Sequence, residues 1–388
     1  MAEAPAADGL SDEARMLRES IRAFMGKNLS ESRIAESEAR GSFPWELIGQ
    51  LREFGYVGGL LPEEAGGFGL TYRAWAMMME EAGYRWLSLR VLLNTLNIVV
   101  ALLHHLGDER QKRKWLEPLL RGELPVWVGI TEPEHGSDVA SVTTRAEERG
   151  DHWLVNGNKL WITNGVNGRL GVLVARTFSP RCDGGLSLFL VDRDETEYEA
   201  SRVGTMFVKA TATSQLGFRD ARIPRENLLG PEGQGLKAIL TGLNYGRLNV
   251  AAGAVGAAQA ALDLATDYVK TRKQFGKTIG GFQLVQKLIV DMTVRTEAAR
   301  ALTDRAAQAM DQGLSARREC SIAKLYASEA AHEVASMALQ AHGGMGYSTD
   351  YPIERIFRDT RGGLIPEGTS EIQTLIIGRE ILGLSAFS

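Results

Sequence analysis

The sequence predicts an α+β fold that is mostly α. We expect an N-terminal helical domain over residues 1–124, a middle antiparallel β-barrel-like domain over residues 125–235 and a C-terminal helical bundle domain over residues 236–388. Three observations lead to this prediction: helical spacing of apolar residues in the first third, short β-rich runs in the middle and long helical patterns afterwards. A chain of 388 residues is also too long for one ordinary core.

Four helical runs are expected in the N-terminal domain. They read SDEARMLRESIRAFM, WELIGQLREFG, YRAWAMMMEEAGYR and LNTLNIVVALLHHLG. Ser11 is expected to open the first run, and Gly55 and Gly107 follow apolar-periodic runs as stop signals. The glycine-rich segment LPEEAGGFGLTY is the expected irregular loop between them.

The middle domain is predicted from short runs of alternating or β-branched residues. These are VWVGI, HWLV, KLWIT, LGVLVAR, LSLFLV and SQLGF. Asn156-Gly157, between HWLV and NKLWIT, predicts a two-residue type I′ hairpin turn, because both turn positions need positive φ. The expected result is a compact antiparallel domain.

The C-terminal domain is predicted to be a bundle of long helices. Residues 236–276 form one long helix or two, with Ala252, Gly256 and Ala260 at a spacing of four residues. Small residues at this spacing allow neighbouring helices to approach closely. Two more helices follow, FQLVQKLIVDMTVRTEAARALTDRAAQAMDQG and RRECSIAKLYASEAAHEVASMALQAHGG, and each ends in glycine.

Composition excludes several classes of function. The formal net charge of −4 argues against a general binder of nucleic acid or of anionic membranes, which needs a basic face. Two cysteines in different regions favour a reducing compartment, and we expect a cytoplasmic protein. The first residues lack the basic and apolar regions of a secretory signal. The uncharged stretch NVAAGAVGAAQAAL is shorter than the roughly 20 residues of a membrane span. The histidines are scattered, so we expect no metal site.

Residues 365–373, IPEGTSEIQ, place a carboxylate at the start of a helix. Ser370 and Gln373 form a capping-box pattern, which predicts a helix beginning near Glu371. Gly368 permits backbone conformations that other residues avoid, and a proline stiffens the approach. Glu367 is therefore expected on a constrained turn just outside a helix N-terminus.

Five segments in order resemble the acyl-CoA dehydrogenases, FAD enzymes that desaturate acyl thioesters between the α and β carbons. The segments are TEPEHGSD, WITNG, RKQFG, QAHGGMGY and PEGTSEIQ, and the resemblance extends over essentially the whole chain. It implies the same three-domain order, an acyl-CoA or acyl-carrier thioester as substrate, and electron-transfer flavoprotein as the electron acceptor.

The resemblance implies that Glu367 removes the α-proton while the β-hydride passes to the flavin N5. The family's other position for the base corresponds to Gly246, which cannot act as one. Two effects act on the pKa of Glu367. A helix N-terminus favours the anion by about 0.3–1 kcal/mol. Burial raises a carboxyl pKa by up to several units, at about 1.4 kcal/mol each, so we expect a raised pKa.

The resemblance also implies a set of flavin contacts. Thr131 and the Gly136-Ser137 pair come from the first motif, with Ser137 also reaching the acyl-CoA site. Trp161 packs on the flavin and Thr163 bonds near N5; two residues apart, they are expected on the same side of a strand. The remaining predicted cofactor residues are Ile162, Arg272, Phe275, Gln283, Gln340, Gly343, Gly344, Thr369 and Glu371. Arg272 is expected to reach the FAD pyrophosphate of a neighbouring subunit, which implies a homo-oligomer, with a tetramer expected.

The predicted substrate contacts are Ser137, Asn244, Tyr245, Arg247 and Gly368. Arg247 is equally consistent with a buried structural ion pair. Three segments depart from the family pattern. Pro366 stands where many relatives have an aromatic residue, and Phe207, Lys209 and Thr211 replace a Gly-x-Arg-x-Ser pattern. The third is TYRAW, residues 71–75, in an expected loop near the substrate mouth. These departures argue against an ordinary straight fatty acyl-CoA.

Three alternatives to a dehydrogenase stay open on the sequence. One is a reductase, or a carrier-protein-linked desaturase, of the same fold. Another is an oxidase that gives its electrons to oxygen. The last is a non-catalytic flavin-binding interaction protein, against which the intact Glu367 and flavin segments argue.

Overall fold

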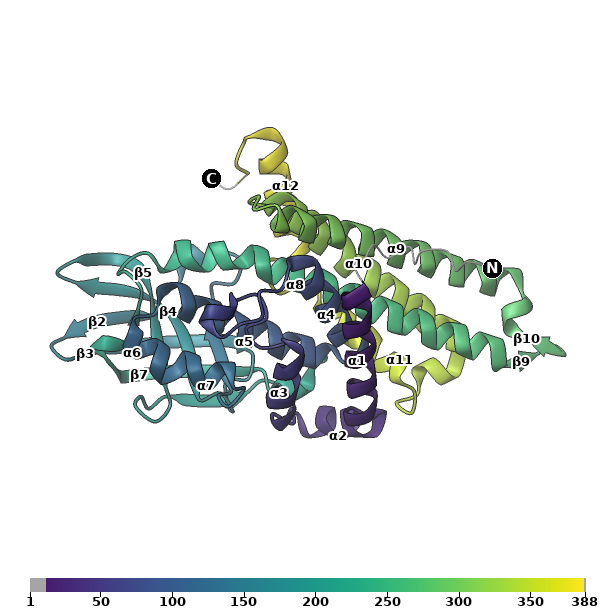
Figure 1. The fold of residues 1–388 in the computed structure, drawn as a ribbon, viewed down its shortest axis with the longest axis horizontal. Coiled ribbons are helices and arrows are strands. Elements are labelled where there is room, and N and C mark those ends of the chain that lie inside the picture. The colour runs from purple at the N-terminus through teal and green to yellow at the C-terminus, as the bar shows by residue number, and fades with distance from the viewer. Residues whose placement is uncertain (1–11, 387–388) are drawn as a thin grey trace.

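Helices, a sheet and helices again follow one another along the chain (Figure 1). The structure is a computed structural model that describes residues 12–386, except for the side chains of Leu240, Thr241 and Leu243. The predicted α+β class, mostly α, is confirmed. Ser11, the expected first helix cap, lies outside the described residues.

The N-terminal region packs around two long helices. Tyr56, Trp75 and Trp86 are among its fully buried side chains. Thr71 caps α4 by accepting a hydrogen bond from the backbone of Ala74. TYRAW is therefore the cap and first turn of a helix, as the run YRAWAMMMEEAGYR predicted, and the expected loop at residues 71–75 is wrong. The helices are α1 (Asp12–Asn28), α2 (Glu31–Arg40), α3 (Glu46–Leu51), α4 (Tyr72–Arg85), α5 (Leu87–Leu106), α6 (Glu109–Gln111) and α7 (Glu117–Leu120).

The middle region holds a mixed sheet rather than a wholly antiparallel one. Its strands are β1 (Val126–Gly129), β2 (Arg145–Arg149), β3 (His152–Ile162), β4 (Leu170–Ser179), β5 (Cys182–Asp192), β6 (Glu199–Arg202), β7 (Ser214–Pro224) and β8 (Leu228–Leu229). They lie in the order β6-β7-β3-β2-β4-β5-β8, and β1 pairs with β4. The β1–β4 and β2–β4 pairs are parallel because each connection crosses over instead of turning back as a hairpin.

The predicted hairpin at Asn156-Gly157 is wrong. β3 runs through both residues, and the chain reverses one strand earlier, between β2 and β3. Gly157 has φ +148° and sits at a register shift against β7. A side chain there would meet Thr144, since a β-carbon would lie 2.6 Å from its Oγ1. The glycine thus marks a bulge and a close approach rather than a turn.

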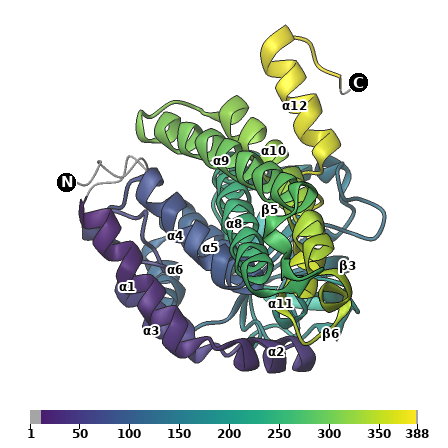
Figure 2. The same ribbon diagram turned by 90° about the vertical axis from the view of Figure 1, so that its right-hand side faces the viewer.

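The C-terminal region is a bundle around one very long helix. Residues expected as one helix or two form the single helix α8 (Gly235–Thr271). After a small β9–β10 hairpin (Lys273–Gln274 and Lys277–Thr278) come α9 (Gln283–Asp311), α10 (Arg317–His342), α11 (Pro352–Gly362) and α12 (Ser370–Leu382). Viewed end-on, α8, α9 and α10 pack together while α12 projects from the body (Figure 2).

The small residues on α8 allow the close approach that their spacing predicted. A β-carbon on Gly256 would lie 1.9 Å from the backbone oxygen of Glu80 in α4. One turn earlier, Gly83 of α4 approaches Gly253 of α8 in the same way, with 2.2 Å between its β-carbon position and the Gly253 oxygen. This contact joins the N- and C-terminal helices around the cavity described below.

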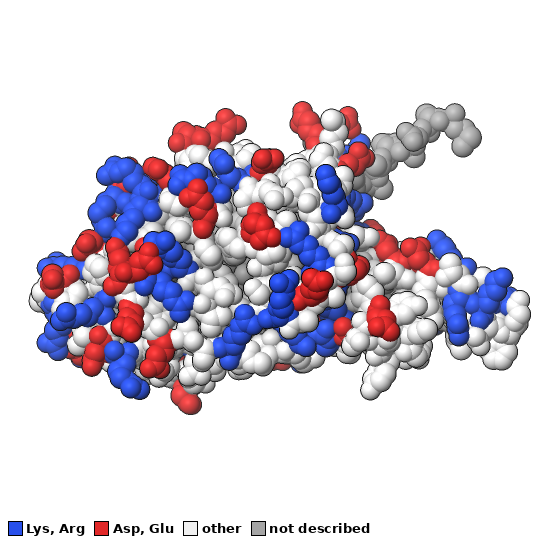
Figure 3. All heavy atoms as spheres, turned by 90° about the horizontal axis from the view of Figure 1, so that it is seen from below, with Lys and Arg blue, Asp and Glu red and all other residues white. Residues whose placement is uncertain are grey.

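In the part of the chain that the structure describes, two helices, α5 and α8, are long and apolar enough to cross a membrane by length and composition. The stretch NVAAGAVGAAQAAL, judged too short by itself, is part of α8. Most of the apolar window of each helix is buried inside the protein, as in the core helix of a soluble protein. On the face shown in Figure 3, acidic and basic side chains are interspersed over the sheet region.

Candidate functional site

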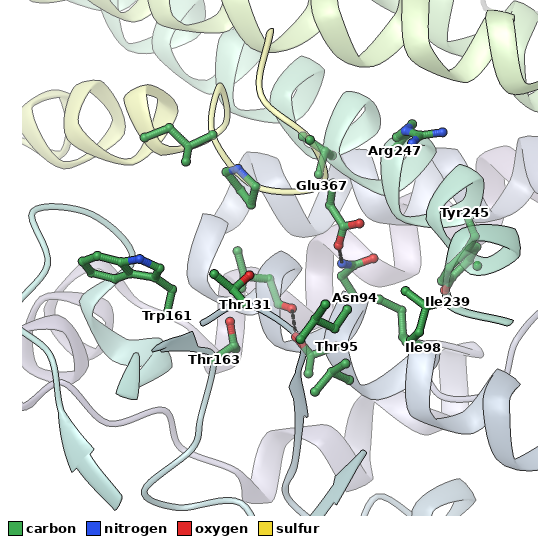
Figure 4. A pocket seen from close by; sticks show the side chains of 18 of the residues that line it. Asn94, Thr95, Ile98, Thr131, Trp161, Thr163, Ile239, Tyr245, Arg247 and Glu367 are labelled. Carbon is green, nitrogen blue, oxygen red and sulfur yellow. Dashed lines mark hydrogen bonds between the residues drawn. The ribbon is translucent and has the colours of Figure 1, made fainter. Parts of the chain in front are cut away.

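A large cavity lies where the sheet meets α5, α8 and the turn before α12 (Figure 4). Its volume is about 1750 Å³. Pockets for one small ligand usually measure about 300–1,000 Å³. The cavity therefore has room for two ligands side by side, with sheet residues on one wall and helical residues on the other.

Glu367 lies on the turn between α11 and α12 and points into the cavity (Figure 4). Its φ is +58°, and that of Gly368 is +88°, so two successive residues adopt the left-handed conformation. This conformation is uncommon for residues other than glycine and needs support from its surroundings. The helix cap is Thr369, which accepts a hydrogen bond from the backbone of Ile372, and not Ser370 as predicted. The predicted cap was wrong by one residue because α12 begins at Ser370 rather than near Glu371.

Two buried side chains hold this turn through its carbonyl groups. Lys324 of α10 donates from Nζ to the oxygen of Gly368 at 2.8 Å and to that of Leu364 at 3.3 Å. Gln373 of α12 donates from Nε2 to the oxygens of Glu367 at 2.9 Å and Gly368 at 3.0 Å. Instead of forming the predicted capping box, Gln373 fixes the backbone that carries the carboxylate.

The carboxylate of Glu367 is desolvated and only partly satisfied. Oε1 accepts a hydrogen bond from Asn94 Nδ2 at 2.9 Å. Oε2 is buried and has no hydrogen-bond partner in residues 12–386. Burial raises the pKa of Glu367, and the Asn94 bond and the charges of Arg90, Arg247 and Lys324 oppose this rise without cancelling it. The expected raised pKa is confirmed in direction.

A chain of buried amides connects this carboxylate to the core. Trp75 Nε1 donates to Asn249 Oδ1 at 2.7 Å, and Asn249 Nδ2 donates to Asn94 Oδ1 at 2.7 Å. Each amide thus uses both its donor and its acceptor, which fixes its orientation. The chain ends on Oε1 of Glu367. The sequence pattern did not reveal it, because its members come from α4, α5 and α8.

Gly246 lies directly against the carboxylate. A β-carbon at this position would be 2.5 Å from Oε2 of Glu367. The space that a side chain at 246 would fill is therefore occupied by the Glu367 side chain. This explains in physical terms why only one of the two positions carries an acidic residue.

The opposite wall carries the residues predicted from the first two motifs. Thr131, Gly136, Ser137, Trp161, Ile162 and Thr163 all line the cavity, as does Thr369 from the turn. Trp161 is 56% exposed and has φ +63°. Trp161 and Thr163 both reach this cavity, as their spacing predicted, although β3 ends at Ile162 and only Trp161 belongs to the strand.

This wall fits a flat aromatic cofactor. An exposed indole beside the hydroxyls of Thr131 and Thr163 offers an apolar face with hydrogen-bonding groups next to it. An exposed tryptophan inside a cavity is costly in water unless a ligand covers it.

The predicted substrate residues divide into two groups. Tyr245, Arg247 and Gly368 line the cavity together with Ser137. Asn244 does not: it donates to the oxygen of Ser315 and accepts from Arg247 Nη1 at 2.8 Å, so it supports Arg247. Arg247 forms no ion pair with any residue of 12–386, so the alternative structural role as an ion-pair member is not seen.

Seven predicted cofactor residues do not line the cavity. Six of them are exposed at other places: Arg272, Phe275, Gln283, Gln340, Gly343 and Gly344. The β9–β10 tip that carries Phe275 lies at the opposite end of the molecule from the sheet (Figure 1). The seventh, Glu371, is exposed on α12, where the Thr369 side chain lowers its pKa by hydrogen bonding.

The remaining departures from the family pattern shape the cavity wall. Phe207 lines the cavity and packs on Gly362, where a β-carbon would lie 2.4 Å from its ring. Lys209 donates from its backbone to Glu38, and the Thr211 hydroxyl donates to the oxygen of Val208. Pro366 also lines the cavity, next to Glu367. In residues 12–386, no group of three or more histidine, cysteine or acidic side chains could hold a metal ion.

Three family models match consecutive parts of the chain. They are the N-terminal domain of acyl-CoA dehydrogenase over residues 11–123, the middle domain over 128–221 and the C-terminal domain over 233–382. The chain belongs to the acyl-CoA dehydrogenase family. Members of this family are FAD-dependent oxidoreductases that act on CH–CH bonds, so the chain is an FAD enzyme of this class.

Similar proteins in this family have different described roles. The caffeyl-CoA reductase-Etf complex subunit CarC of Acetobacterium woodii is 36% identical over 376 residues, 96% of this chain and 99% of that protein. The mitochondrial short-chain specific acyl-CoA dehydrogenase of Rattus norvegicus is 37% identical over 375 residues, which are 96% of this chain and 91% of that protein. A solved structure of a glutaryl-CoA dehydrogenase of Mycobacterium smegmatis in complex with FADH2 superposes with a TM-score of 0.92 at 28% identity. The match covers 98% of this chain and 97% of that one. These relatives identify the family but not one substrate.

Proposed function

We propose that this chain desaturates an acyl-CoA thioester between its α and β carbons, with Glu367 as the base that removes the α-proton. The observation that carries the proposal is the buried carboxylate whose Oε2 has no partner in residues 12–386 and which lines the cavity. An unpartnered buried oxygen is available to accept a proton. A raised pKa brings the strength of this base closer to neutral pH, where proton abstraction is most efficient.

FAD, when bound, supplies the acceptor for the hydride that leaves the β carbon. Thr131, Ser137, Trp161, Thr163 and Thr369 would hold it, since all five line the cavity. The Trp161 side lies across the cavity from Glu367 in Figure 4. A substrate between the two walls would thus present opposite faces of its α–β bond to the base and to the cofactor. We infer that Tyr245, Arg247 and Gly368 contact the substrate, since they line the same cavity.

Electron-transfer flavoprotein is the proposed electron partner. The family relationship and the name of the Acetobacterium relative, a subunit of a reductase-Etf complex, support this proposal. That same name favours a second candidate, reduction of an enoyl thioester by the same site. The residues of the site are the same for either direction, because Glu367 removes the α-proton in one and returns it in the other.

We further propose that the active form is a homo-oligomer, with a tetramer as the expected state. Phe275 is 93% exposed and does not line this chain's own cavity, and the β9–β10 tip lies at the opposite end of the molecule from the sheet (Figure 1). Arg272, Lys273 and Lys277 are exposed at the same tip, and basic side chains gather at that end in Figure 3. An exposed aromatic ring among basic side chains suits the pyrophosphate and adenosine part of a cofactor held by a second copy.

An anaerobic titration of the FAD-loaded protein with straight, branched, cyclic and carrier-bound acyl thioesters tests the proposal. We expect at least one saturated thioester to bleach the yellow absorbance without air. Bleaching that is followed by peroxide formation in air indicates an oxidase. Bleaching by reduced electron-transfer flavoprotein, with reoxidation by an enoyl thioester, indicates the reductase. No response to any thioester indicates a flavin-binding protein without catalysis.

Asn94→Leu should shift the pH dependence of the reaction. The Asn94 bond lowers the pKa of Glu367, so its loss raises that pKa further. A hydrogen bond to a charged group contributes about 1.5–3 kcal/mol, or about one to two pKa units. The base must be ionised to act, so the acidic limb of kcat/KM should move to higher pH by about one unit or more. Stopped-flow rates of flavin reduction, recorded from about pH 6 to about pH 10, measure this shift of the acidic limb.

Thr95→Val provides the matched control for this shift. Thr95 is the next residue on α5 and also lines the cavity, but its hydroxyl bonds the oxygen of Val91 rather than Glu367. The valine variant should therefore keep the pH profile of the wild type. An unshifted profile in Asn94→Leu would remove Asn94 from the control of the base.

A further inference from the structure

One buried cation in the cavity, Arg90, has no hydrogen-bond or ion-pair partner among residues 12–386. Arg90 lies on α5, one turn before Asn94, lines the cavity and is 5% exposed. Its guanidinium makes no hydrogen bond and no ion pair with any residue of 12–386, and its Nε is fully shielded. A buried guanidinium without a partner is strongly unfavourable. The protein therefore maintains at this point a costly group that its own side chains do not satisfy.

The packing of α5 against α8 creates the space for this side chain. A β-carbon on Gly253 of α8 would lie 2.7 Å from Cγ of Arg90 and 2.9 Å from Cδ. Any larger residue at 253 would displace the arginine. The stem of Arg90 thus lies in a fixed position against the α8 backbone, and its guanidinium is placed at the cavity wall rather than free to turn to solvent.

The charges around the base are not balanced. Arg90, Arg247 and Lys324 all act on Glu367, and each of the three is buried. Lys324 is satisfied by the carbonyls of the turn, and Arg247 is held by Asn244. Among residues 12–386, the acidic group that acts on Arg90 is Glu367, and its Oε1 accepts a hydrogen bond from Asn94 instead. Three cations thus face one carboxylate, and burial lowers the pKa of Arg90 to about 10, which still leaves it charged at neutral pH.

We propose that Arg90 binds a carboxylate on the acyl arm of the substrate, which is then a monothioester of a dicarboxylic acid. The inference rests on the proposed function. A guanidinium presents paired N–H donors that match a carboxylate in a bidentate arrangement, and this pairing is strongest where water is excluded. A second carboxylate would also reduce the surplus of positive charge beside the base. The neighbouring cavity residues Val91 and Ile98 are apolar, so they offer the carboxylate no competing cation.

Binding of unreactive analogues to the FAD-loaded protein tests this inference. The probes are thioether analogues of CoA with four- to six-carbon arms (about the length range of short dicarboxylic acids) that end in either a carboxylate or a methyl group. Titration calorimetry should show the carboxylate series binding at least about 30-fold more tightly than the methyl series of matched length. Arg90→Met should remove this preference, and Arg90→Lys should restore part of it. The corresponding thioesters give the same comparison in kcat/KM.

Arg355→Met is the matched control. Arg355 is buried to a similar degree, at 8% exposure, but it pairs with Glu31 and does not line the cavity. This variant should keep the preference even if it lowers stability. FAD content and the unfolding midpoint show whether each variant is folded.

Equal binding of the two series by the wild type would overturn the inference, and this measurement needs no variant. An equal loss of both series in Arg90→Met would also overturn it, since it would indicate a structural role. The proposed dehydrogenation fails separately, if no thioester bleaches the flavin. In that case the binding series still decides whether Arg90 recognises a carboxylate.

Discussion

Replacing Glu367 by glutamine should abolish reduction of the flavin by acyl thioesters while the protein stays yellow. Glutamine retains an oxygen that can accept the hydrogen bond from Asn94 Nδ2, so the turn and the amide chain should persist. It cannot take up a proton at neutral pH. A positioned general base contributes roughly 10²–10⁴-fold, and the rate of anaerobic reduction should fall by at least this factor.

This prediction is tested by measuring FAD content, substrate binding and the rate of flavin reduction in one preparation of the Glu367→Gln variant. FAD is expected to remain bound because Trp161, Thr131 and Thr163 lie on the opposite wall. Glu371→Gln is the matched control, since Glu371 is four residues further on, exposed and outside the cavity. In the Glu371→Gln variant, the acyl thioester should reduce the flavin at the rate of the wild type. A Glu367→Gln variant that turned over normally would end the assignment of the base.

Replacing Gly256 by alanine should cause the largest loss of stability among single small substitutions on α8. The new β-carbon would lie 1.9 Å from the oxygen of Glu80 and 2.6 Å from the nitrogen of Tyr84, both in the backbone of α4. Backbone cannot rotate away as a side chain can, so the two helices must separate. Overpacking of this kind costs about 1–3 kcal/mol, occasionally more, and we expect the upper end. Chemical denaturation measures the change.

The separation of α4 from α8 should also affect the cavity, because Asn249 of α8 and Trp75 of α4 are joined across this contact. We therefore expect slower reduction of the flavin together with the loss of stability. Gly26→Ala in α1 is the control, because nothing lies within 4 Å of its β-carbon position. Alanine is a better helix former than glycine by up to about 1 kcal/mol, so this variant should be slightly more stable. Equal stability of Gly256→Ala and wild type would refute the close contact.

Local patterns in the sequence were sufficient for much of the fold and part of the site. Helical periodicity identified the long helices, because one apolar face repeats within a few residues of chain. The motif around Glu367 identified the carboxylate on its constrained turn. Local patterns failed where pairing decides the structure. β2 and β6, with the sequences RAEER and EASR, were missed because charged residues dominate them and only neighbouring strands make them part of the sheet.

The Asn156-Gly157 pair shows the same limit. The dipeptide favours a tight turn in isolation, but pairing of β3 with β7 and the closeness of Thr144 make it a bulge. The conformational preference of a dipeptide contributes only about 1 kcal/mol. Pairing within the sheet contributes many hydrogen bonds and buried side chains, so it outweighs that preference.

By itself, the sequence determined the order of the three regions, the family and the identity of the acidic residue, because each depends on residues close together along the chain. The tertiary structure alone decided the environment of that residue. Asn94, Arg90, Lys324 and Gly246 come from three different helices and meet only around Glu367. A carboxyl pKa depends on which charges, dipoles and water molecules lie within a few ångströms. Those neighbours are set by packing between distant segments, which no single stretch of sequence contains.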